Sequence, residues 1–106
     1  LLSPFIREIR SKGIKLGLYY SLPDWSYKDY THHTNKIKRY NIQENPKRWN
    51  RFLKYRDGQL KELKTRYNPD LWWFDGDWEH NAVEWKIIEL KNILKKNSPN
   101  VIFNSR

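Results

Sequence analysis

The stretch from Asp70 to Glu79 concentrates the side chains of this sequence whose types and spacing could do chemistry. An apolar run, Leu-Trp-Trp-Phe, leads directly into Asp75, and Gly76 follows. Side chains alternate between the two faces of a strand, so Trp73 and Asp75 would share one face. An ionised carboxylate at the tip of a buried strand is costly unless a partner or ligand binds it. We therefore interpret Asp75 as the chemical centre. The alternative is a carboxylate that only caps the next turn, because Asp before Gly is common turn chemistry.

Alternating strand and helix patterns surround this stretch. Near-continuous apolar runs predict three strands, over residues 14–21, 71–75 and 101–106, and indicate that the first two are buried on both faces. Apolar side chains at helical spacing predict three helices, near residues 2–12, 46–67 and 83–94. Strands that alternate with helices form parallel β/α layers, whose ligands bind at the carboxyl ends of the strands. The sequence thus predicts an α/β fold with three neighbouring parallel strands and intervening helices.

A long aromatic-rich segment, residues 22–46, separates the first strand from the second helix. Loops of this length in compact domains are usually functional or disordered, and the aromatic content favours order. His32 and His33 are adjacent, so they would point apart on regular structure, which is not the spacing of a metal site. We therefore expect no metal here.

The composition is typical of one small globular domain. The 106 residues are 38% hydrophobic, 31% charged and 16% aromatic. The absence of cysteine excludes a disulfide framework and thiol chemistry. No apolar run approaches the ~18 residues that cross a membrane, so we expect no membrane partner. The sequence has no Met and no signal-peptide pattern, and we expect it to begin inside a longer protein.

The net charge of +9 is concentrated in one part of the chain. Residues 28–66 hold twelve Lys or Arg and four Asp or Glu, whereas residues 67–106 hold five and six. A basic segment is compatible with nucleic-acid binding. A solvated outer helix face explains the same pattern, and we favour that interpretation. No Gly-rich phosphate-binding motif supports nucleotide binding.

Five stretches combine particular residue types in a fixed order: residues 17–21 (GLYYS), 24–25 (DW), 59–63 (QLKEL, of which Gln59, Leu60, Glu62 and Leu63 match), 67–79 (YNPDLWWFDGDWE) and 101–106 (VIFNSR). Together they closely resemble the catalytic domain of α-L-fucosidases, glycoside hydrolase family 29, over nearly the whole chain. The resemblance implies a fragment of a (β/α)8 TIM-like barrel, with residues 1–106 forming roughly its third to fifth strands.

The resemblance also implies a reaction and its residues. It implies a retaining α-L-fucosidase that releases terminal α-L-fucose from oligosaccharides or glycoconjugates, with no metal or other cofactor. Asp75 would be the nucleophile, and Trp73, Tyr20 and Arg106 would bind substrate. Secreted, periplasmic and lysosomal locations are all compatible with this resemblance, and the oligomeric state stays open.

Two parts of the family's active site have no match in this sequence. The family's pocket histidines would precede Leu1, and its general acid/base would follow Arg106. We therefore assign neither role to the histidines of residues 32–33, nor the acid/base role to Asp77 or Glu79. For this reason we expect the fragment alone to be inactive.

Elementary chemistry agrees with these roles, but it also allows other roles for the same residues and other functions for the chain. Retaining glycosidases need two carboxyl groups ~5–5.5 Å apart, and a cation such as Arg106 would keep Asp75 ionised. Trp73 would pack against the apolar side of the sugar, although packing in the barrel core is the alternative for Trp73, and core packing is the alternative for Tyr19 and Tyr20. The alternative functions are a non-catalytic carbohydrate-binding remnant and, less favoured, a basic nucleic-acid-binding module.

Overall fold

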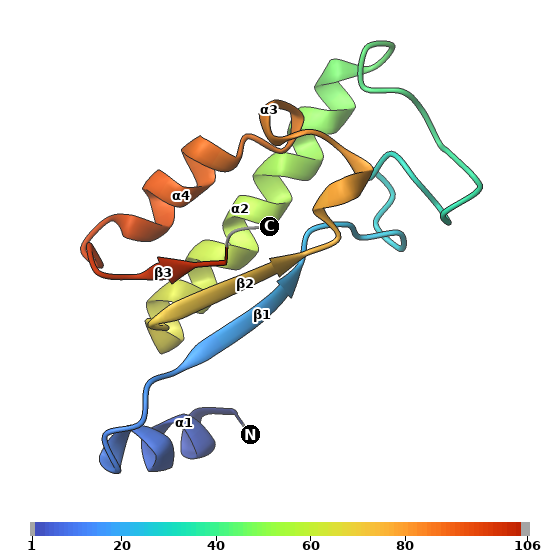
Figure 1. Ribbon diagram of the computed structural model, residues 1–106. Helices are drawn as coiled ribbons and strands as arrows, with labels where there is room; N and C mark the ends of the chain where they lie inside the picture. Colours follow the sequence, from blue (N-terminus) through green and yellow to red (C-terminus); the bar gives the residue numbers. More distant parts are fainter. Residues whose placement is uncertain (1, 105–106) are drawn as a thin grey trace.

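A computed structural model of the chain, which describes residues 2–104, forms a three-stranded sheet with the helices of residues 46–67 and 87–95 packed on one face, whereas the first helix lies apart from them (Figure 1). The elements in chain order are α1 (Leu2–Ser11), β1 (Gly17–Ser21), α2 (Pro46–Tyr67), β2 (Leu71–Asp75), the 3-10 helix η1 (Asp77–Glu79), α3 (Ala82–Trp85), α4 (Ile87–Lys95) and β3 (Ile102–Phe103). None of the helices in the described part is both long and apolar enough to cross a membrane.

The three strands are parallel and neighbours in the order β1-β2-β3, which confirms the predicted α/β arrangement. In the register of β1 and β2, Tyr19 lies opposite Trp73, and Ser21 lies opposite Asp75. The two strands therefore end level with each other. The first and last strands are shorter than predicted, and residues 105–106 lie outside the described part of the chain. The described strands form an open sheet and not a closed barrel.

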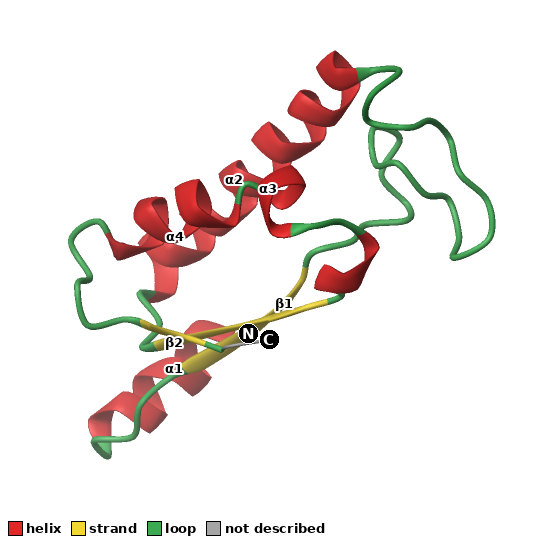
Figure 2. Cartoon of the chain, turned by 45° about the horizontal axis from the view of Figure 1, so that its top comes forward, coloured by secondary structure: helices red, strands yellow, loops and turns green. Residues whose placement is uncertain are grey.

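Helices α2 and α4 cover one face of this sheet (Figures 1 and 2). The core between the layers is built from buried side chains of β2, α2 and α4, among them Trp72, Phe74, Phe52, Leu60, Leu90 and Leu94. On the other face, Tyr19 is 64% exposed and Trp73 is 45% exposed. The prediction that β1 and β2 are buried on both faces is therefore wrong for the described residues, because no described element covers the second face.

Helix α2 has the predicted bounds, and local chemistry explains both ends. The Asn45 side chain caps the first turn by accepting a hydrogen bond from the Arg48 amide, and Pro46 occupies the first turn. The helix ends at Asn68, whose backbone adopts the left-handed conformation with φ of 42°.

The single helix predicted over residues 83–94 is wrong, because the chain breaks at Lys86. The backbone of Lys86 has a φ of 53°, and α3 and α4 meet there. The break changes which side chains face the core: Trp85 is 1% exposed, whereas Val83 is 85% exposed. A capping box between Asn81 and Glu84 begins the short α3.

The loop between β1 and α2 is ordered around one buried ring, as its aromatic content predicted. Tyr30 is fully buried and contacts Phe52 of α2, with ring centroids 4.8 Å apart, and stacks on Trp85 at 6.1 Å. A single antiparallel bridge between His32 and Lys38 closes the outer part of the loop.

Candidate active site

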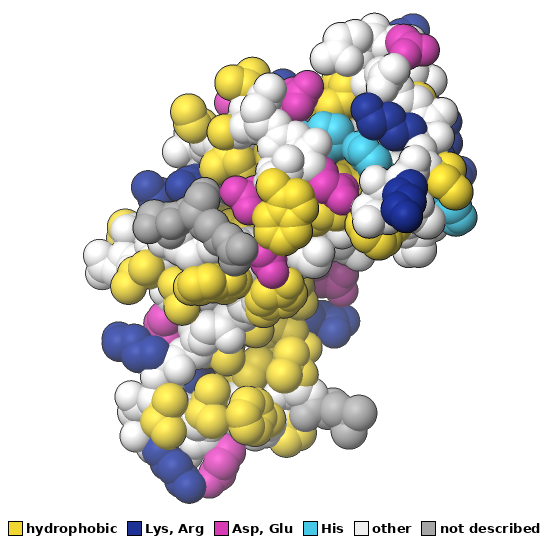
Figure 3. Space-filling view, turned by 45° about the vertical axis from the view of Figure 1, so that its right-hand side comes forward, with side chains coloured by type: hydrophobic (Ala, Val, Ile, Leu, Met, Phe, Trp, Pro, Cys, Tyr) yellow, Lys and Arg dark blue, Asp and Glu magenta, His cyan; other side chains and the backbone are white. Residues whose placement is uncertain are grey.

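A pocket of about 670 Å³ opens at the carboxyl ends of β1 and β2, where α/β proteins bind ligands. Its volume is within the range of small-molecule sites. The wall residues that carry the argument below come from β1, the following loop, β2 and η1: Tyr19, Trp25, Asp75, Gly76, Trp78 and Glu79. In Figure 3, hydrophobic and acidic side chains lie together across the middle of the face shown. Aromatic rings beside carboxylates suit a ligand with both apolar faces and hydroxyl groups, as a sugar has.

Asp75 is half-buried at the end of β2, and hydrogen bonds fix its carboxylate. The Tyr19 hydroxyl donates to Asp75 Oδ2 at 2.7 Å, and the Gly76 amide donates to Asp75 Oδ1 at 2.9 Å. The second bond is the turn cap that the sequence suggested as an alternative role. Asp75 therefore caps the turn and also lines the pocket, so the two interpretations are compatible.

The two adjacent tyrosines of β1 lie on opposite faces of the sheet. Tyr19 reaches Asp75, whereas the Tyr20 hydroxyl donates to Gln59 Oε1 of α2 at 2.7 Å and its ring packs edge-on against Phe74. Burial in the helix-facing layer raises the pKa of Tyr20. The structure does not bring Tyr20 to Asp75. Tyr19 is the site residue that sequence reasoning missed, because only the register of β1 against β2, which pairs Tyr19 with Trp73 on the face of Asp75, distinguishes it from Tyr20.

The other two substrate-binding candidates are Trp73, which the structure describes, and Arg106, which it does not. Trp73 lies two residues before Asp75 on the same face of β2, with 45% of its surface exposed. It therefore lies outside the core between the sheet and helices α2 and α4, and the alternative considered for it, packing in a barrel core, stays a prediction. Arg106 lies outside the described residues.

Glu79, in η1, connects the strand end to the loop after β1. Its Oε1 accepts a hydrogen bond from the Tyr30 hydroxyl at 2.6 Å. The Trp25 indole N–H lies 3.1 Å from Oε2 and 3.3 Å from Oε1. Burial, reinforced by the bond to Glu79, raises the pKa of Tyr30. These contacts join residues about fifty positions apart and define one side of the pocket.

A histidine pair lies beside this connection, but it is not the adjacent pair of the sequence. Thr31 Oγ1 is 2.8 Å from His32 Nδ1 and 2.8 Å from His80 Nε2, while His33 is exposed on the loop. His80 also lies 3.5 Å from Glu84, and burial lowers the pKa of His80. Across residues 2–104, no three His, Asp or Glu side chains are grouped closely enough to hold a metal ion.

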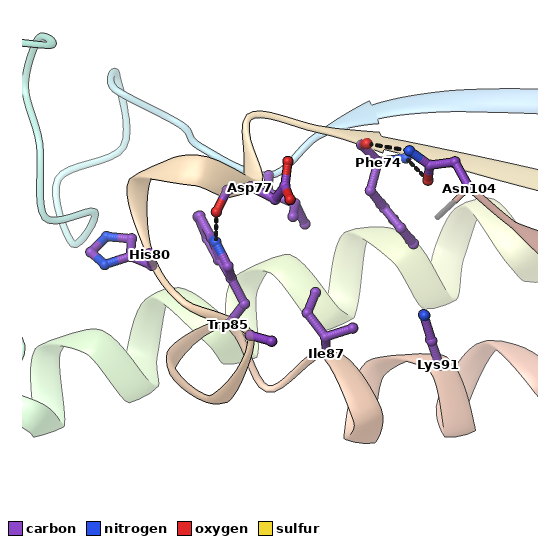
Figure 4. A pocket seen from close by; sticks show the side chains of 9 residues that line it. Phe74, Asp77, His80, Trp85, Ile87, Lys91 and Asn104 are labelled. Carbon is purple, nitrogen blue, oxygen red and sulfur yellow. Dashed lines mark hydrogen bonds between the residues drawn. The ribbon is translucent and has the colours of Figure 1, made fainter. Parts of the chain in front are cut away.

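A second cavity, of about 510 Å³, lies in the helix-facing layer. Figure 4 shows Trp85, Ile87 and Lys91 along it, with the Trp85 indole donating to the backbone oxygen of Asp77 at 2.8 Å. On its other side, the Asn104 side chain exchanges two hydrogen bonds of 2.9 Å with the backbone of Phe74 and thereby extends the pairing of β2 with β3 (Figure 4). Phe74, which also lines this cavity, lies on the face of β2 opposite to Asp75.

A carboxylate flanked by aromatic rings at the carboxyl ends of parallel strands is the arrangement expected of a carbohydrate-processing α/β enzyme. Sequence comparison identifies the class more closely: the family model described as alpha-L-fucosidase matches residues 1–106, and the chain belongs to this glycoside hydrolase family.

Curated relatives agree with the family model. The chain is 32% identical over 103 residues to an alpha-L-fucosidase of Dictyostelium discoideum, covering 94% of this chain and 21% of the relative. It is 31% identical to the tissue alpha-L-fucosidase of Bos taurus (92% and 20% covered) and 30% identical to that of Rattus norvegicus (92% and 20%). The chain thus spans about a fifth of the length of these relatives. No solved structure matches it.

Proposed function

We propose that residues 1–106 form part of the catalytic domain of a retaining α-L-fucosidase, with Asp75 as the nucleophile. The observation that carries the proposal is the position of Asp75: it ends β2, is held by hydrogen bonds at both oxygens and lines a pocket with aromatic walls. The proposed substrates are glycoconjugates with terminal α-L-fucose, in keeping with the names of the relatives.

In the proposed reaction, an oxygen of Asp75 attacks the anomeric carbon of fucose and the bond to the leaving group breaks. A carboxyl group of the same protein, beyond residues 1–106, protonates the leaving oxygen and then deprotonates the water that releases fucose. A carboxylate oxygen has more than one lone pair, so the bonds from Tyr19 and Gly76 leave Asp75 able to attack. These bonds also hold the carboxylate in one orientation, which lowers the cost of reaching the reactive geometry.

We assign the remaining sugar contacts by the face of the sheet on which each side chain lies. We assign Tyr19 to the pocket that it lines, and we assign Trp73 to the sugar site because it lies beside Tyr19 on the Asp75 side of the sheet, although it does not line the pocket itself. Tyr20, which the family resemblance implies as a pocket residue, would act from beneath the pocket by holding β1 on α2 through Gln59. Arg106 remains the proposed cation near Asp75.

We also propose that the open sheet is part of a (β/α)8 barrel, at about its third to fifth strands. Parallel neighbours in chain order and helices on one face support this arrangement. The exposed rings of Tyr19 and Trp73 would then face the barrel interior.

Substitution of Asp75 in the complete chain that carries these residues tests the proposal. Asp75→Gly should lower kcat on an aryl α-L-fucoside by several orders of magnitude, because the glycosyl-enzyme cannot form. Added azide should enter the vacated space, restore part of the turnover and yield a fucosyl azide of inverted configuration.

Asp77→Asn is the matched control for the loss of a nearby carboxylate. The structure uses the backbone oxygen of Asp77 for the bond to Trp85, and this survives the substitution, so the cost should be small. Near-normal turnover of Asp75→Gly, or a trapped fucosyl adduct on Asp77 or Glu79, would contradict the assignment.

A further inference from the structure

Trp25 is an exposed aromatic residue that is nevertheless held at two points. Its indole N–H donates to Glu79, and its backbone oxygen accepts a 2.7 Å hydrogen bond from the Arg39 guanidinium. With 41% of its surface exposed, the ring contributes to the pocket wall beyond the end of the strands. A large side chain on a loop would ordinarily be free to rotate; the bond to Glu79 restrains the Trp25 ring, and the bond from Arg39 restrains the backbone that carries it.

The residue that holds the Trp25 ring, Glu79, is itself bonded to the core. Glu79 also accepts the hydrogen bond of Tyr30, which is fully buried against Phe52 and Trp85. A carboxylate that accepts bonds from two aromatic side chains connects the rigid core to the pocket rim. This chain of contacts, from Tyr30 through Glu79 to Trp25, is the arrangement that pre-organises a binding surface.

The position of Trp25 assigns it to the part of the substrate beyond the fucose. Fucose must place its anomeric carbon at Asp75, at the strand ends, and the group attached to that carbon extends from there toward the rim. Trp25 belongs to the loop wall of the same pocket, and the volume of about 670 Å³ leaves room for more than one sugar ring. A flat indole face is suited to stacking on the apolar face of that second sugar.

We propose that Trp25 contacts the sugar to which fucose is attached, and that Glu79 is a positioning residue that fixes the Trp25 ring for this contact. The inference rests on the proposed fucosidase function and deepens it. It makes Trp25 a determinant of leaving-group preference, and it gives Glu79 a role that involves no proton transfer.

The test compares two substrates in the complete chain: α-L-fucosyl fluoride, which has no second sugar, and a fucosylated disaccharide. Trp25→Ala should raise KM for the disaccharide about tenfold, the size expected for a lost aromatic contact. Its KM for the fluoride and its kcat on both substrates should stay within about twofold of the parent enzyme. Ile37→Ala, which removes another exposed apolar side chain of the same loop, is the control and should change neither.

The positioning role of Glu79 is tested by whether the effects of two substitutions on the disaccharide KM add up. Trp25→Phe keeps a ring but removes the N–H donor, and Glu79→Gln weakens the acceptor. Each single substitution should raise the disaccharide KM by less than Trp25→Ala does, and the double variant should be no worse than the more severe single variant, because both substitutions act on the same hydrogen bond. These milder substitutions also keep the test valid if Trp25→Ala fails to fold.

Three outcomes would overturn the inference. Equal losses on both substrates would place Trp25 against fucose itself. An unchanged KM for the disaccharide would remove Trp25 from the binding surface. A fall in kcat rather than a rise in KM for Glu79→Gln on the disaccharide, together with azide rescue of its turnover of the fluoride to give a fucosyl azide of retained configuration, would make Glu79 an acid/base instead. Failure of the proposed function is distinguishable, because the parent enzyme would then hydrolyse neither substrate.

Discussion

The Tyr19 side chain donates a hydrogen bond to the proposed nucleophile and helps to orient it. We predict that Tyr19→Phe lowers kcat/KM on an aryl fucoside by about tenfold or more, since a hydrogen bond to a charged group contributes about 1.5–3 kcal/mol. Steady-state kinetics of the complete enzyme measures this. The neighbouring Tyr20→Phe is the control: it removes a bond to Gln59 on the helix side and should cost about 1 kcal/mol of stability with little effect on kcat/KM. Equal kinetic effects at both positions would contradict the two-face assignment.

His80 makes a prediction about pH. Burial lowers the pKa of His80 below its ordinary value of 6.5, in spite of the opposing effect of the Glu84 and Glu79 carboxylates; the proximity of His32 lowers it further. The unfolded chain therefore binds a proton at this position more readily than the folded chain. The stabilisation is complete above the unfolded pKa and is lost as the pH falls through 6.5 toward the folded value.

Thermal unfolding across pH checks this sign. We expect Tm to fall between about pH 7.5 and pH 5, and His80→Gln should reduce that fall because the titrating group is gone. His33→Gln, at an exposed position of the loop, should leave the slope unchanged. A parent slope that His80→Gln does not alter would mean that other groups control the acid sensitivity.

At the scale of elements, the turn from β2 into η1 depends on Gly76. Its φ is 77°, and a Cβ added there would lie 2.4 Å from Pro23 Cδ of the loop after β1. We predict that Gly76→Ala destabilises the chain by more than about 2 kcal/mol, because the left-handed conformation of an L residue alone costs roughly 1–2 kcal/mol. The free energy of unfolding from denaturant titration is the measurement.

Gly58, in the middle of α2, is the matched control for this substitution. An added Cβ there meets nothing within 4 Å, so Gly58→Ala should stabilise the chain by about 0.5–1 kcal/mol through helix propensity. Opposite signs at the two glycines are the expected result. A tolerated Gly76→Ala would show that the approach of Pro23 to the turn is not required.

At the scale of the whole molecule, the +9 charge lies largely in the loop and helix before β2. Arg48 and Arg51 each lie 3.3 Å from the buried carboxylate of Asp29, so part of the basic segment serves internal ion pairs. A Lys or Arg engaged in this way is a weaker ligand for phosphates than a free one. This favours the interpretation of a solvated helix face over a nucleic-acid interface.

The open face of the sheet leads to a prediction about the chain as a unit. Residues 1–106 alone should show no turnover of an aryl α-L-fucoside above buffer, because retention requires a second carboxyl group ~5–5.5 Å from the first. Glu79, the nearby candidate, is already bonded to Trp25 and Tyr30. Clear activity of the fragment would mean that Asp77 or Glu79 supplies the second carboxyl group after all.

The sequence by itself determined the features that depend on local chemistry. The alternation of strands and helices, the ends of α2 at Pro46 and Asn68, and the shared face of Trp73 and Asp75 follow from periodicity and from residues with restricted backbones. The motif around Asp75, together with the other matching stretches, also identified the family, which the family model confirmed. The break at Lys86 was not predictable in this way, because a non-glycine residue in the left-handed conformation carries no clear sequence signal.

Only the tertiary structure decided which side chains meet at the candidate site. Tyr19 and not Tyr20 reaches Asp75, because the register of β1 against β2 selects one of two alternating faces, and a shift by one residue would exchange them. Glu79 meets Trp25 across 54 positions of sequence, since the loop after β1 folds back over η1. Contacts of this kind depend on how distant segments pack together, and no periodicity within either segment encodes them.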